Sequence, residues 1–177
     1  MDKKTGIILG VSTGVTAIVG GSAYFSPYLT LNNMKTATTN RDVVALANEI
    51  DFPSLRKSVK KGVRARLAQE VSKQENNIAA EAMGGDMLTK IVDPAVDKLV
   101  TPEGLSQLMQ DKIPGAKIDI ADLEKNMADS QIDMGYESID RFVVNISDKV
   151  DQSKQVKLIL QRDGFSWKLA GVNMPNS

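Results

Sequence analysis

The chain has 177 residues, enough for one domain with a single hydrophobic core, and no linker divides it in two. Its 22 Lys and Arg balance 22 Asp and Glu, so no overall field attracts nucleic acid, and the absence of Cys excludes disulfides and thiolate metal sites. The absence of His removes the Ser-His-Asp and Cys-His catalytic arrangements and the usual zinc sites. We therefore expect a protein that is not an enzyme and that holds neither a cofactor nor a metal.

The N-terminal stretch has the pattern of a membrane anchor. Lys3 and Lys4 precede residues 6–25, which are apolar or small, and no charged side chain occurs between residues 5 and 34. At about 1.5 Å per residue, a helix of this length matches a hydrocarbon core of about 30 Å. Ser26-Pro27 is expected to end the span, near aromatic residues that suit the membrane interface: Tyr24, Phe25 and Tyr28.

Cations near the ends of a span set its orientation, so Lys3 and Lys4 are expected to stay in the cytoplasm. The sequence then predicts a single-pass membrane protein, with a cytoplasmic stub and anchor over residues 1–25 and one exported domain over residues 26–177. Two alternatives stay open for the apolar segment. It could be a signal peptide cleaved near Ala23, leaving a soluble exported protein, or a buried core helix.

Gly6, Gly10 and Gly14 repeat at every fourth position of the predicted span. This spacing of small residues would let two anchor helices approach closely and form a homodimer. Glycine is common in such spans, so composition explains the spacing about as well as helix pairing does.

Helical periodicity follows the anchor. Tyr28, Leu31 and Met34 recur at intervals of three, and Asp42 is placed to cap a second, short helix. Next comes the corner Asp51-Phe52-Pro53. Phe52 is expected to end the preceding helix because it stands before a proline. Asp51 or Phe52 is expected in the cap region of the next helix, and Pro53 in its first turn. That helix is expected from about Ser54 to Gln74.

This third helix carries a dense set of cations at helical spacing: Arg56, Lys57, Lys60, Lys61 and Arg64. The simplest interpretation is that these cations form a solvent-exposed face of the helix. Because the set follows a membrane anchor, it could instead lie against anionic lipid headgroups. Nucleic acid is the weakest of the three interpretations, since no aromatic platform or recognition motif accompanies the cations.

The second half is expected to add two turns and then a sheet. Asp93-Pro94 and Thr101-Pro102 each place a capping residue before a proline at a helix start, and residues 116–123 alternate like a short strand. From residue 131 the period is two, which predicts an antiparallel meander of three or four strands with a hairpin at Asp163-Gly164. Trp167 and Leu169 are expected on its packed face. The fold class is therefore α+β.

Several of these segments together resemble a bacterial family called domain of unknown function 2939. The residues that carry the resemblance are Ser26-Pro27-Tyr28-Leu29-Thr30-Leu31, Asn40-Arg41-Asp42, Asp51-Phe52-Pro53-Ser54-Leu55-Arg56, Val92-Asp93-Pro94, Leu99-Val100-Thr101-Pro102-Glu103-Gly104-Leu105 and Trp167-Lys168-Leu169. The resemblance implies an exported or membrane-attached protein of Gram-negative bacteria and supplies no catalytic residues. It would place a retained anchor in the inner membrane and the domain in the periplasm, or, after cleavage near Ala23, a soluble protein in the periplasm. More loosely, helices ahead of a meander are similar to the cystatin-like or nuclear-transport-factor-like roll.

Three hypotheses about function follow. The first is a non-enzymatic envelope module that binds a lipid, a peptide or a partner protein of the envelope in an apolar pocket. The second is an enzyme that uses a carboxylate or tyrosine base, with Asp51, Asp93 and Tyr136 as candidates. The third is an electrostatic module that binds anionic membranes through its basic helix.

Overall fold

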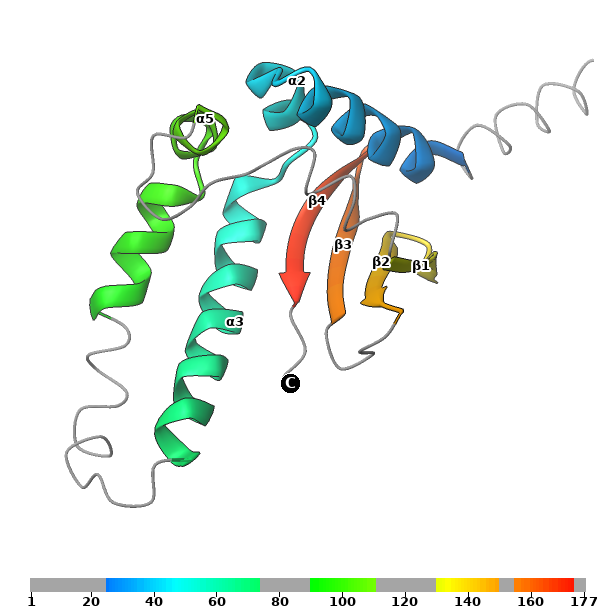
Figure 1. The fold of residues 1–177 in the computed structure, drawn as a ribbon. Helices are drawn as coiled ribbons and strands as arrows, with labels where there is room; N and C mark the ends of the chain where they lie inside the picture. Colours follow the sequence, from blue (N-terminus) through cyan, green and yellow to red (C-terminus); the bar gives the residue numbers. More distant parts are fainter. Residues whose placement is uncertain (1–24, 74–89, 111–129, 150–154, 174–177) are drawn as a thin grey trace, which may run out of the picture.

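In the computed structural model, the helices come first and a four-stranded antiparallel sheet follows (Figure 1). The structure describes residues 25–73, 90–110, 130–149 and 155–173. The predicted anchor, including Gly6, Gly10 and Gly14, lies outside these ranges, and so does the strand predicted over residues 116–123. Within these ranges, none of the helices combines the length and the hydropathy that a membrane crossing requires.

The first described helix covers residues 25–39 and is the blue helix of Figure 1. Ser26 and Pro27 lie in the first turn of this helix, where proline is tolerated, and the predicted end of the anchor helix depends on residues outside the described ranges. After a turn in which Arg41 has a φ of 54°, α2 (Val43–Asn48) begins. The Asp42 carboxylate accepts a hydrogen bond from the Ala45 N–H at 2.9 Å, which confirms the predicted cap.

The long helix α3 (Phe52–Lys73) starts at the predicted corner. The Ser54 N–H donates to the Asp51 carboxylate at 3.2 Å, so Asp51 caps the helix and Pro53 lies in its first turn, as the sequence predicted. Phe52 is the first residue of α3 and does not end the preceding helix, because α2 already ends at Asn48.

A helix over residues 90–99 and α5 (Pro102–Met109) follow α3 in the chain. The Thr101 hydroxyl accepts a hydrogen bond from the Gly104 N–H at 2.9 Å, which confirms Thr101 as a cap and Pro102 as the first helical residue. The same prediction for Asp93-Pro94 is wrong, since both residues lie within the 90–99 helix. Asp93 has a different role, described below.

The sheet contains β1 (Ser130–Ser138), β2 (Arg141–Asp148), β3 (Gln155–Asp163) and β4 (Ser166–Asn173) in sequence order. The last hairpin turns at Gly164 and Phe165, one residue later than predicted, and Gly164 has a φ of 62°. A positive φ at the first central residue is typical of the II′ turn, which matches the twist of paired strands.

The main core lies between the 25–39 helix and one face of the sheet. Its buried members are Phe142, Val144, Leu160 and Trp167, and Tyr28 and Leu31 of the helix pack against them. Burial of Trp167 and Leu169 confirms the predicted packed face. The Trp167 indole N–H donates to the Ser26 hydroxyl at 2.8 Å, so the polar end of this buried ring is satisfied. A smaller core joins Ala37, Leu46 and Met109 among the helices.

The outer edge of β4 is covered by the chain around the Asp51 cap. Leu169 donates its N–H to the Glu49 carbonyl at 2.8 Å and accepts from the Asp51 N–H at 3.0 Å. Further along β4, the Ser58 hydroxyl contacts both the N–H of Val172 at 3.1 Å and its carbonyl at 3.0 Å. These contacts satisfy backbone groups that an open edge would leave unpaired, and they fix α3 beside the sheet.

Candidate functional site

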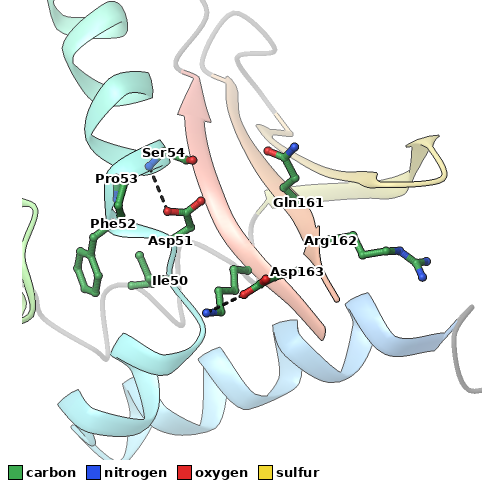
Figure 2. A pocket seen from close by; sticks show the side chains of 9 residues that line it. Ile50, Asp51, Phe52, Pro53, Ser54, Gln161, Arg162 and Asp163 are labelled. Carbon is green, nitrogen blue, oxygen red and sulfur yellow. Dashed lines mark hydrogen bonds and ion pairs between the residues drawn. The ribbon is translucent and has the colours of Figure 1, made fainter. Parts of the chain in front are cut away.

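A polar pocket of about 520 Å³ lies where the start of α3 meets the hairpin between β3 and β4 (Figure 2). We call it the corner pocket. Its lining comes from two separate parts of the chain: Ile50, Asp51, Phe52, Pro53 and Ser54 from the corner, and Gln161, Arg162, Asp163 and Lys168 from the hairpin. The sequence singled out the corner half, whereas only the pairing of residues 49–51 with Leu169 brings the hairpin half to it.

The charged groups of the corner pocket are balanced, with two carboxylates and two cations. Lys168 pairs with the Asp163 carboxylate at 2.9 Å, and this hydrogen bond raises the pKa of Lys168. The negative charges of Asp51 and Glu49 act in the same direction. A site of this composition suits a polar ligand or a polar side chain of a partner, and it differs from the apolar pocket that the first hypothesis expected.

Arg162 stands at the rim of the corner pocket. Its guanidinium carbon lies 4.8 Å from the centre of the Trp167 ring, a cation–π arrangement that holds the side chain against the core. Its buried Nε has no hydrogen-bond partner among the described residues. In Figure 2 the side chain points away from the Asp51 carboxylate.

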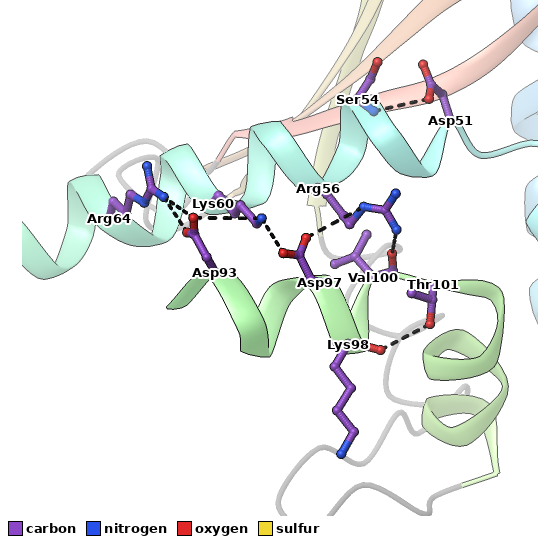
Figure 3. Close-up of polar contacts among 10 residues, drawn as sticks. All are labelled: Asp51, Ser54, Arg56, Lys60, Arg64, Asp93, Asp97, Lys98, Val100 and Thr101. Carbon is purple, nitrogen blue, oxygen red and sulfur yellow. Dashed lines mark hydrogen bonds and ion pairs between the residues drawn. The ribbon is translucent and has the colours of Figure 1, made fainter. Parts of the chain in front are cut away.

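The basic helix faces the 90–99 helix through an interhelical ladder of ion pairs (Figure 3). Arg64 binds the Asp93 carboxylate, Lys60 binds Asp97 at 2.7 Å, and Arg56 lies 3.9 Å from Asp97. Arg56 also donates to the Val100 carbonyl at 3.3 Å. Because Asp93 and Asp97 are four residues apart on one helix face, they match cations spaced by four on the other.

The five predicted cations therefore fall into two groups. Arg56, Lys60 and Arg64 are partly buried in the ladder, whereas Lys57 and Lys61 are exposed. No ion pair joins Lys57 or Lys61 to another described residue. Sequence reasoning missed the acidic half of the ladder because it treated Asp93 as a cap; the spacing of Asp93 and Asp97 was the available signal.

The three catalytic candidates are not brought together. Asp51 caps α3 beside the corner pocket, while Asp93 belongs to the ladder. Tyr136 packs edge-on against Phe142 and Trp167, with ring centroids 5.1 and 5.6 Å away. Over the described part of the chain, no three acidic side chains lie close enough to hold a metal ion.

A third charged cluster, which the sequence did not indicate, crosses the surface of the sheet. Glu137 of β1 binds Lys157 of β3, and its other oxygen lies 2.8 Å from Arg141 of β2. The hydrogen bond from Lys157, together with the charges of Lys157 and Arg141, lowers the pKa of the exposed Glu137 carboxyl. The cluster links three strands on the surface.

Comparison with known proteins places the chain in a family. A family model described as "Protein of unknown function (DUF2939)" matches residues 16–108, just over half of the chain. The protein belongs to this family. In this DUF2939 member, the matched range contains the corner, α3, the ladder and most of α5. Trp167-Lys168-Leu169, which also carried the resemblance, and the whole sheet lie beyond the match. No curated protein and no solved structure matches the chain.

Proposed function

We propose that this protein is a non-enzymatic interaction module, held at the periplasmic face of the inner membrane by an anchor over residues 6–25. The observation that carries the proposal is that the helix at the end of the proposed anchor is also the core helix of the domain. Tyr28 and Leu31 pack on the sheet, and Ser26 binds Trp167, within six residues of Phe25. The chain enters the core without a linker, so the anchor would hold the domain directly at the bilayer.

Interaction rather than catalysis is supported by how the ionisable groups are used. The Asp51 carboxylate is engaged in a helix cap, Asp93 in the ladder and Asp163 with Lys168. Side chains that act together in catalysis must lie within hydrogen-bond reach of one another or of one substrate, and the three candidates lie in different parts of the fold. The corner pocket is the surface that we assign to a polar ligand or partner.

Protease accessibility of a C-terminal tag in spheroplasts tests the location. We expect the tagged chain to stay in the membrane fraction after an alkaline wash and to be digested from outside. A tag recovered in the soluble periplasmic fraction would show a cleaved signal peptide. A membrane-held tag that resists the protease would place the domain in the cytoplasm and contradict the proposal.

A matched pair of variants checks the cause of the orientation. Lys3→Glu with Lys4→Glu removes the cations directly before the predicted span and should lower the digested fraction. Lys57→Glu with Lys61→Glu makes the same charge change at exposed positions far beyond the span, and this variant should leave the digested fraction unchanged.

A further inference from the structure

Four exposed apolar side chains gather at one end of the sheet, although they come from three segments far apart in the sequence. Phe25 is 60% exposed, Leu29 62%, Ile139 83% and Phe165 99%. Phe25 and Leu29 belong to the first described helix, Ile139 to the turn between β1 and β2, and Phe165 to the turn between β3 and β4. We call these four residues the apolar rim.

Hydrogen bonds and ring contacts place the segments that carry the apolar rim at the same end of the sheet. The Arg162 N–H donates to the Asp140 carbonyl at 2.9 Å, so the β1–β2 turn lies against the end of β3, next to the turn that carries Phe165. The Ser26–Trp167 hydrogen bond joins the residue after Phe25 to the second residue after Phe165. The Phe25 ring also lies 6.4 Å from that of Tyr28, which packs on Phe142 at the start of β2.

We infer that the apolar rim rests in the interfacial layer of the membrane to which the chain is anchored. This inference depends on the proposed anchor over residues 6–25, which ends at Phe25, itself a member of the rim. Since no linker separates the anchor from the core, the Ser26–Trp167 hydrogen bond holds the β3–β4 turn beside the point where the chain would leave the bilayer. Exposed aromatic and aliphatic side chains at this depth are stabilised by the boundary between headgroups and acyl chains.

The same geometry places the basic helix away from the lipid. α3 is joined to β4 at Leu169 through Asp51 and at Val172 through Ser58, so it runs along β4 away from the turns, as Figure 1 also shows. Seven residues of strand separate Phe165 from Val172, which is about 20 Å. Lys57 and Lys61 lie on either side of Ser58, which is bound to Val172. The distance of these two lysines from the apolar rim therefore exceeds the screening length of about 8 Å at physiological salt. The apolar rim therefore contacts the membrane and the exposed cations do not.

The absence of Cys from the chain makes single-site labelling specific. We would introduce Phe165→Cys, Ile139→Cys and, as a control, Val44→Cys, attach an environment-sensitive fluorophore and reconstitute the full-length protein into phosphatidylcholine vesicles that contain acyl-chain nitroxide lipids. Val44 is a matched control because it is apolar and 73% exposed but lies in α2, beyond the far end of the 25–39 helix. We expect quenching by the nitroxide lipids to be several-fold stronger at residues 139 and 165 than at residue 44.

Each outcome decides between the possibilities. Protein that floats with the vesicles but shows equal, weak quenching at all three positions would overturn the inference and leave the anchored module intact. Protein that fails to float with the vesicles would overturn both the inference about the apolar rim and the proposed anchor. Lipid-independent disulfide dimers of the unlabelled Phe165→Cys and Ile139→Cys variants, without lipid quenching, would show that a second copy covers the apolar rim and would also overturn the inference.

Discussion

At the scale of single residues, close backbone contacts decide where a side chain can stand. A Cβ on Gly104 would lie 2.1 Å from the Leu99 carbonyl oxygen, because α5 packs directly against the end of the 90–99 helix. A Cβ on Gly171 would meet the Ser58 hydroxyl at 2.9 Å, the same hydroxyl that satisfies the edge of β4. Gly62 in the middle of α3 has nothing within 4 Å.

The two helical glycines should respond to alanine in opposite directions. Gly62→Ala should raise the free energy of unfolding by about 1 kcal/mol, because alanine is the better helix former. Gly104→Ala should lower it by about 1–3 kcal/mol, since backbone atoms must move to admit the methyl group. Urea unfolding followed by the fluorescence of the single Trp167 measures both. A stabilised Gly104→Ala variant would show that α5 does not pack on Leu99 as described.

At the scale of elements, the interhelical ladder joins α3 to the 90–99 helix. Val92 and Val96 supply the buried residues of the 90–99 helix, and Leu99 is 46% exposed. The side chains of Lys60 and Asp97 are 21% and 52% exposed, so solvent screens their attraction. Exposed pairs of this kind contribute about 0.2–1 kcal/mol each to the free energy of unfolding. The ladder therefore sets how α3 and the 90–99 helix align more than it stabilises the fold.

A charge exchange tests this role. Lys60→Asp places a third carboxylate beside Asp93 and Asp97 and should lower the free energy of unfolding by about 1 kcal/mol, with Asp97→Lys in the same chain restoring part of it. Lys57→Asp, on the exposed side of α3, is the matched control and should have little effect. Urea unfolding at low and high salt measures the difference, which should shrink as salt is added. Equal effects of the Lys57 and Lys60 changes would contradict the ladder.

At the scale of the whole molecule, the 25–39 helix connects the two cores. Its first half packs on the sheet through Tyr28 and Leu31, and its second half, with Ala37, belongs to the helical cluster that contains Leu46 and Met109. Thr30, only 5% exposed, also donates to the Trp167 carbonyl at 3.3 Å. The 25–39 helix is thus the element on which the domain is assembled.

Removal of this helix should therefore unfold the whole domain and not only remove one element. A chain that starts at residue 41 exposes the buried ring of Trp167, so we expect its fluorescence emission to move to the red and limited proteolysis to digest the sheet. A chain that starts at residue 25 is the control and should keep the blue emission of a buried indole. If both chains show the same protected Trp167, the core does not depend on the helix.

The sequence by itself determined the features that depend on neighbours three or four residues apart. Asp42, Asp51 and Thr101 could be assigned as caps because each carboxylate or hydroxyl accepts from an N–H three residues later. The α+β order and the packed position of Trp167 followed from periodicity, and the family followed from the corner and its neighbouring segments.

Only the tertiary structure decided which distant segments meet. The local sequence predicts Asp93 as a cap before Pro94. In the structure, Arg64 of α3 lies opposite Asp93 and forms one of the ion pairs of the ladder with it. The corner pocket and the apolar rim each join residues more than 100 positions apart, and no pattern within a short window of sequence specifies such contacts.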